Sequence, residues 1–199
     1  LPIISGADDA ILASMLMLFL RSSNHKMAIT VFASLFGDSK YSIELFVDSV
    51  KCVAAYFFLW RSTSSNSGLD STYREFFKHN SGESFTLENL KKYFRDMLNK
   101  KEIDTANNWK IKAKNYLKYD KTGKDIVRLA LLIAADDTIA DADNKGLIKK
   151  GRPGCSSFLN LDKWNSVDTK SIEHVAPQKN VNGLWDSNMY DENIQTYQS

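Results

Sequence analysis

Residues 41–60, YSIELFVDSVKCVAAYFFLW, form the longest helical pattern in the chain. Their apolar side chains recur at helical spacing and cover a wide face, which is typical of a helix at the centre of a core. The apolar positions are Ile43, Leu45, Phe46, Val50, Val53, Ala54, Phe57 and Phe58. The stretch therefore predicts a long central helix around which a helical domain is built.

Helical periodicity continues on both sides of this stretch. Upstream, the sequence predicts a helix that Asp8 or Asp9 caps and that ends near Arg21, and a second helix at about 26–36, closed by Gly37. The Ser-rich segment 62–68 predicts a connection between helices. Four more helices are expected: one with Tyr73, Phe76 and Phe77, one opened by Thr86, one starting at Asp104 or Thr105, and one over Asp125 to Ala135.

The composition changes after Asp136, where helical periodicity gives way to polar residues, Gly and Pro. We therefore predict a mainly α protein with a helical domain over residues 1–136. The loop-rich segment 137–199 is expected to contain little β structure. A chain of 199 residues is long enough for one helical domain with a small appendage.

The overall composition is that of an ordinary soluble globular protein, with 43% hydrophobic residues and a net charge of +2. The apolar run at 10–20 is shorter than the roughly 20 residues that cross a bilayer, and Asp8 and Asp9 stand where a signal peptide would be basic. Cys52 and Cys155 fit neither a metal-ligand spacing nor a disulfide framework. We therefore expect a cytoplasmic protein.

Residues 172–178, IEHVAPQ, are the strongest candidate for chemistry. The first residues predict a short strand that carries Glu173 beside His174, and Pro177 ends strand pairing because it has no N–H to donate. A carboxylate can hold a divalent cation while a neutral imidazole takes a proton from an attacking water. This pair therefore suits hydrolysis of a phosphodiester.

The same string resembles the first half of an HNH, or His-Me finger, nuclease motif. More narrowly, it is similar to the C-terminal nuclease domain of GmrSD-type restriction endonucleases, which cut foreign or modified DNA. The resemblance implies that His174 is the general base, that Glu173 binds a divalent metal, most simply Mg²⁺, and that Pro177 and Gln178 are structural. It also implies a ββα metal finger, DNA as substrate, and an N-terminal sensor and nucleotide-hydrolysing domain as partner.

The second strand and the helix that supply an Asn or His ligand in that family do not follow before Ser199. We therefore expect a partial finger, a second metal ligand beyond Ser199, and no cleavage by this segment alone. An alternative stays open, in which the chain is a helical DNA-binding or protein-interaction module without catalysis. Glu173 and His174 would then be structural, as most Glu-His pairs are.

Two basic regions are candidates for nucleic-acid binding. From Lys91 to Arg128 there are twelve Lys or Arg against five Asp or Glu, with aromatic residues interleaved. Such a segment could bind phosphates, although the more common arrangement has lysines in solvent and aromatics packed inward. The better candidates are the expected loop cations near the motif, and the predicted nucleic-acid-binding residues are Lys149, Lys150, Arg152 and Lys179.

Residues 141–146, DADNKG, begin like a calcium-binding EF-hand loop. Position five is Lys145 and position twelve is Arg152, where a bidentate Glu is required, so a calcium loop is not predicted. A structural role, capping or ending a helix, is expected ahead of the alternative of a carboxylate near a metal for Asp136, Asp137, Asp141 and Asp143. Trp164 is expected to anchor a loop to the core, and His79 to be a surface or capping residue.

Overall fold

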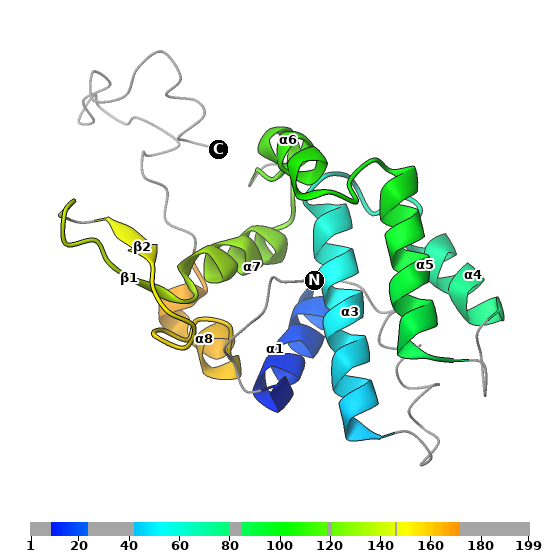
Figure 1. Ribbon diagram of the computed structural model, residues 1–199, viewed down its shortest axis with the longest axis horizontal. Coiled ribbons are helices and arrows are strands. Elements are labelled where there is room, and N and C mark those ends of the chain that lie inside the picture. Colours follow the sequence, from blue (N-terminus) through cyan, green and yellow to red (C-terminus); the bar gives the residue numbers. More distant parts are fainter. Residues whose placement is uncertain (1–8, 24–41, 80–84, 119–120, 146, 172–199) are drawn as a thin grey trace.

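A computed structural model describes residues 9–23, 42–79, 85–118, 121–145 and 147–171 of the protein. Within these ranges the fold is mainly α-helical, as predicted, with one two-stranded antiparallel sheet (Figure 1). The helix expected at about 26–36 and the motif at 172–178 lie outside the described residues.

Helices α1 (Asp9–Ser22) and α3 (Ile43–Arg61) lie side by side at the centre of the fold (Figure 1). α3 is the long central helix that the sequence predicts. Its first turn is capped by Ser42, whose Oγ accepts a hydrogen bond from the N–H of Leu45 at 3.2 Å. The two helices bury their apolar faces against each other, and the ring of Phe19 meets that of Phe57 edge-on at 5.5 Å.

Helices α4 (Leu69–His79) and α5 (Leu87–Lys100) cover the other side of α3. Thr86 caps α5 as predicted, because its Oγ1 accepts from the N–H of Asn89 at 3.1 Å. The aromatic residues of the three helices form one cluster, in which Tyr56 stacks on Phe94 with ring centroids 4.1 Å apart. Apolar burial of large rings is the main stabilising contribution here.

Helix α6 (Ala106–Tyr116) lies across one end of α3, and α7 (Lys124–Ala135) runs from there back alongside α1 (Figure 1). Thr105 caps α6 through its Oγ1, which accepts from the N–H of Asn108 at 3.3 Å. α7 begins at Lys124, one residue before the start at Asp125 that the sequence predicts. Both predicted helix starts are therefore confirmed to within one residue.

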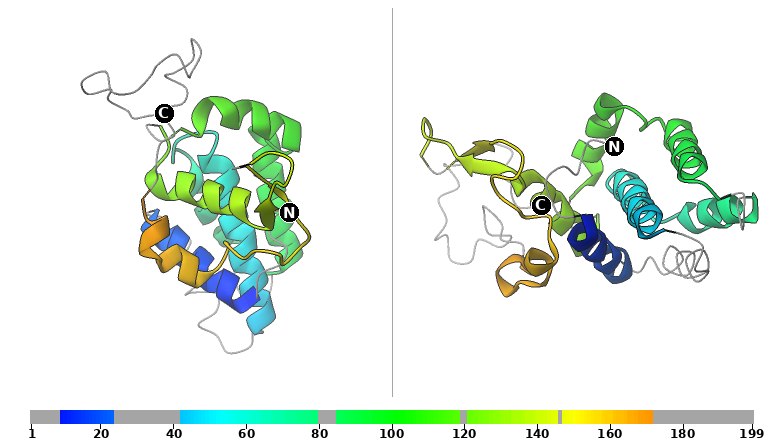
Figure 2. Two further views of the ribbon diagram at one scale, coloured as in Figure 1. Left: turned by 90° about the vertical axis from the view of Figure 1, so that its left-hand side faces the viewer. Right: turned by 60° about the horizontal axis from the view of Figure 1, so that its bottom comes forward.

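The chain after α7 forms a hairpin and two short helical turns. Strands β1 (Thr138–Ala140) and β2 (Ile148–Lys150) pair with Thr138 opposite Lys150. They project away from α4 and α5 (Figures 1 and 2). Helix α8 (Leu161–Asn165) and the 3-10 helix η2 (Val167–Thr169) follow. Helical periodicity does end where the sequence predicts, but the expected loop there contains these short elements.

The segment after the hairpin joins the core of the helices. Leu159 and Trp164 are buried in the same hydrophobic cluster as α1 and α3. The Trp164 ring meets the Phe19 ring edge-on at 5.9 Å, so the predicted anchoring role of Trp164 is confirmed. The predicted domain boundary at about residue 137 thus coincides with a change in local structure, while the core continues across it.

Among the described helices, none has both the length and the apolar character that crossing a bilayer requires. The apolar run in α1 is explained by packing, since Met15, Leu16 and Phe19 are all buried in the core.

Candidate functional site

The predicted catalytic residue His174 and metal ligand Glu173 lie outside the described residues, as does Lys179. The structure describes the segment that leads to them, 158–171, and the elements on which that segment packs. It also places three of the predicted nucleic-acid-binding cations. The local geometry of this region decides which of its side chains are free to bind a ligand.

The lead-in segment is ordered by capping and by core packing. Asn160 caps α8, because its Oδ1 accepts from the N–H of Lys163 at 2.8 Å. Ser166 caps η2 through its Oγ, which accepts from the N–H of Asp168 at 3.3 Å. Trp164, between the two caps, is buried against α1. Each of the two short helices thus has a capping hydrogen bond, and the buried ring of Trp164 holds both of them on the core.

Arg128 of α7 holds this segment from the other side. Its guanidinium donates to the carbonyl oxygens of Trp164 and Lys163 and to the hydroxyl of Thr169, the last at 3.2 Å. It also lies over the Trp164 indole, 4.3 Å from the ring centroid. Burial lowers the pKa of Arg128, while the charge of Asp125 acts in the opposite direction. Arginine nevertheless remains charged in proteins, so Arg128 fixes the backbone just before the motif.

A second group of hydrogen bonds, made by two aspartates, joins the end of α7 to the loop before α8. Asp136 is 6% exposed, and its Oδ1 accepts from the N–H groups of Phe158 at 2.8 Å and Leu159 at 3.2 Å. Asp137 has a φ of +54°, and its Oδ1 accepts from the N–H of Gly154 at 2.6 Å. The expectation that these aspartates are structural is confirmed, because both carboxylates satisfy backbone donors of the following loop.

The cations predicted to lie in a loop are differently placed. Lys149 and Lys150 belong to strand β2, so that part of the prediction is wrong, whereas Arg152 does follow the strand in a bend. The strand forms because β2 pairs with β1. The exposed sequence Ile-Lys-Lys does not by itself predict this pairing. Lys150 Nζ donates to the carbonyl oxygen of Asp136, which ties its side chain back to α7.

Lys149 is engaged within the hairpin. Its Nζ lies 3.1 Å from a carboxylate oxygen of Asp141 and 3.4 Å from one of Asp143. Hydrogen bonds from Asn144, Lys149 and the N–H of Asp143 lower the pKa of Asp141. The ammonium group therefore lies between the two carboxylates with which an EF-hand loop would hold calcium, in agreement with the sequence-based exclusion of a calcium loop.

Two of the aromatic residues interleaved in the basic segment 91–128, Tyr93 and Trp109, pack against the core. The Tyr93 ring lies 5.2 Å from a phenylalanine ring of α4. Trp109 donates from Nε1 to Ser62 Oγ at 2.8 Å, and its ring is partly buried against α3. Tyr119 lies outside the described residues. The arrangement that the sequence favours, with aromatics inside, is confirmed for Tyr93 and Trp109.

Across the described ranges, no group of three or more His, Cys, Asp or Glu side chains is placed so as to hold a metal ion. His79, at the end of α4, is exposed and faces Glu75 at 3.7 Å, which agrees with the expected surface role. No protein-family model matches the chain, and no curated protein matches it significantly. The resemblance to HNH nucleases therefore rests on residues 172–178 alone.

Sequence reasoning missed the positioning role of Arg128. A signal was present, because Arg128 is the one charged residue in the run IVRLALLIAA, residues 126–135. A charge within the most apolar late helix must find polar partners once the helix is buried. Its partners here are backbone carbonyls more than thirty residues away, at Lys163 and Trp164. Such long-range pairs cannot be read from local spacing.

Proposed function

We propose that this protein provides the HNH-type nuclease domain of a DNA restriction or anti-phage defence endonuclease. The observation that carries the proposal is the string at 172–178, with an acid and an imidazole side by side before a strand-ending proline. In this proposal DNA is the substrate, and the partner is an N-terminal domain that senses the target and hydrolyses nucleotide. The cytoplasm is the proposed location, in keeping with the free thiols of Cys52 and Cys155.

The proposed reaction is hydrolysis of a phosphodiester. His174 takes the proton of the attacking water and so makes it a better nucleophile towards phosphorus. Glu173 supplies a carboxylate oxygen, the donor that a hard divalent cation such as Mg²⁺ prefers, and the remaining ligands come from other residues. A cation bound there would offset negative charge on the phosphate oxygens during the reaction.

The packing of the lead-in segment supports this proposal. A general base and a metal ligand must be held within a fraction of an ångström of their working positions, which requires a rigid supporting backbone. The backbone is fixed in this way up to Thr169, four residues before Glu173, by the contacts of Arg128, Asp136 and Trp164. The same contacts would also serve a non-catalytic domain, so the motif remains the decisive observation.

The test is plasmid nicking by the natural full-length protein with Mg²⁺, comparing His174→Ala with His79→Ala. The two variants remove the same side chain, and His79 is exposed at the end of α4, away from the motif in sequence. We expect His174→Ala to reduce cleavage at least about 100-fold, the usual contribution of a general base, with DNA affinity unchanged. His79→Ala should cleave like the wild type. Unaltered cutting by His174→Ala would remove His174 from the mechanism.

The runner-up is a helical module that binds DNA or a protein without cutting. It is favoured by the many lysines of the helical body, which would serve binding equally well. The same assay separates the two proposals. Binding without Mg²⁺-dependent nicking, in the wild type as well as in His174→Ala, would establish the module and exclude the nuclease.

A further inference from the structure

Helix α6 differs from the neighbouring helices in its charges. Its sequence, ANNWKIKAKNY, contains three lysines and no Asp or Glu, whereas α4 and α5 carry both signs. Glu102 and Asp104 precede the helix, and Glu102 pairs with Lys112 at 3.2 Å. Lys110 and Lys114 are exposed, and no ion pair of theirs occurs within the described ranges.

The geometry of the helix puts these groups on one outer face. Trp109 and Ala113 point inward, so residues about half a turn away point outward. We define the α6 face by the exposed residues Asn107, Lys110, Ile111 and Lys114. Because Lys110 and Lys114 are four residues apart, their side chains are neighbours on the helix surface.

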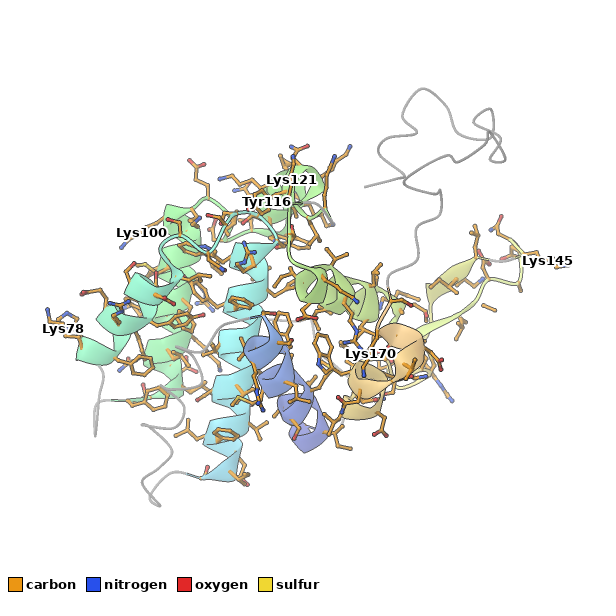
Figure 3. All side chains as sticks on the ribbon, turned by 180° about the vertical axis from the view of Figure 1, so that it is seen from behind. Lys78, Lys100, Tyr116, Lys121, Lys145 and Lys170 are labelled. Atoms are coloured by element: carbon orange, nitrogen blue, oxygen red, sulfur yellow. The ribbon has the colours of Figure 1, made fainter. Side chains whose placement is uncertain are left out.

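The α6 face is held rigidly on the core. The hydrogen bond from Trp109 to Ser62 connects the middle of α6 to the end of α3, and Thr105 caps its first turn. Beyond the helix, Thr122 is buried and donates from Oγ1 to the carbonyl oxygen of Tyr116 at 2.7 Å, which fixes the turn into α7. Lys121 lies in this turn and extends the positive charge (Figure 3).

The positive charge of the face continues onto the first turn of α7. Lys124 is the first residue of α7 and is exposed. It lies one helical turn before Arg128, an axial rise of about 6 Å, and Arg128 holds the backbone that leads to Glu173. A chain of phosphates that follows Lys110, Lys114 and Lys124 would therefore run towards the described residues 163–169 that Arg128 contacts.

We propose that the α6 face binds the phosphate backbone of the DNA on which the nuclease acts, an inference that rests on the proposed function for its ligand. Lysine ammonium groups and asparagine amides are the side chains that contact phosphate and sugar without reading sequence. An open hollow of about 330 Å³ beside the face is lined by Glu102, Asn108, Ile111 and Lys112. Lipid surfaces fit less well, because Ile111 is the one large apolar side chain exposed on α6 and a membrane-bound helix buries a whole apolar face.

The test compares Lys110→Gln/Lys114→Gln with a matched pair on α4, Arg74→Gln/Lys78→Gln. Both double variants remove two exposed positive charges spaced four residues apart, and glutamine is compatible with a helix. Lys78 lies at the edge of the molecule, far from Tyr116 at the end of α6 and from Lys121 beyond it (Figure 3). The measurement is the affinity for a mixed-sequence DNA duplex in EDTA at several salt concentrations.

We expect the α6 pair to reduce the slope of log affinity against log salt by about 2, one per lost phosphate contact, and to weaken binding about tenfold. The α4 pair should leave the slope unchanged. An equal effect of both pairs, no effect of the α6 pair, or equally strong binding of poly-glutamate would overturn the proposal. Because EDTA prevents cleavage, this result is independent of whether His174 is catalytic.

Discussion

Arg128 joins helix α7 to the lead-in segment through its guanidinium group. It is 7% exposed and serves three oxygen acceptors on the segment at 163–169. Buried acceptors that lose a charged donor keep the unfavourable free energy of desolvation without its compensation. One guanidinium thus connects α7, the most apolar late helix, to the backbone that precedes the proposed catalytic pair.

Replacement of Arg128 by Met, which has a similar length, should therefore lower the free energy of unfolding by about 2–3 kcal/mol. The control is Arg95→Met on α5, where the side chain is exposed, with an expected change below about 0.5 kcal/mol. Urea unfolding followed by tryptophan fluorescence measures both. Equal stability of the two variants would show that the contacts of Arg128 contribute little.

Among the elements, the hairpin β1–β2 depends on a close approach at Gly151. A Cβ atom there would lie 2.5 Å from Cys155 Sγ and 2.9 Å from Ile139 Cγ2. The N–H of Gly151 also donates to the carbonyl oxygen of Asp137 at 2.7 Å, so the backbone cannot shift away without losing this bond. The hairpin base is thus closed by backbone contact rather than by a large apolar face.

Gly151→Ala should destabilise the protein by about 1–3 kcal/mol, the usual range for overpacking. Gly123→Ala is the control, because nothing lies within 4 Å of the added methyl group, and a change below about 1 kcal/mol is expected. Thermal unfolding compares them. Adding Cys155→Ala to Gly151→Ala should restore part of the loss, since it removes the nearest clashing atom. No difference between the two glycines would contradict this account of the hairpin.

The sequence predicts some elements well and others poorly, for physical reasons. The helix starts at Thr86 and Thr105 could be predicted because a capping hydrogen bond joins residues that are close in sequence. The strand Ile148–Lys150 is exposed throughout and has no alternating pattern, so only its pairing with β1 reveals it. Helix α8 has five residues, too few for periodicity to be visible. The candidate site was accessible from sequence only through its motif, whereas its support by Arg128 is a long-range contact.

At the scale of the whole molecule, buried ionisable groups make stability depend on pH. Burial raises the pKa of the Cys52 thiol to about 11 and also raises the pKa of Tyr56 and Tyr73. Between about pH 9 and 11 the unfolded chain therefore loses the Cys52 proton while the folded protein keeps it. Ionisation then favours the unfolded state, so the free energy of unfolding falls as the pH rises through this window.

We expect Cys52 alone to account for a loss of roughly 2 kcal/mol near the top of this window, at about 1.4 kcal/mol per unit of pKa difference. Urea unfolding at about pH 8 and about pH 10.5 measures the change. In Cys52→Ala the loss should be smaller by nearly this amount, whereas the control Cys155→Ala, at a partly exposed position, should behave like the wild type. Identical losses in all three proteins would contradict the assignment to Cys52.

The central proposal is that a phosphodiester bond is hydrolysed beside residues 172–178. The most direct measurement is strand cleavage of bound plasmid DNA by the natural full-length protein, as Mg²⁺ is added and then removed with EDTA. We predict nicking that requires Mg²⁺, stops with EDTA and is lost in His174→Ala at equal DNA occupancy. DNA that stays intact while fully bound, at every Mg²⁺ concentration, would contradict the nuclease proposal.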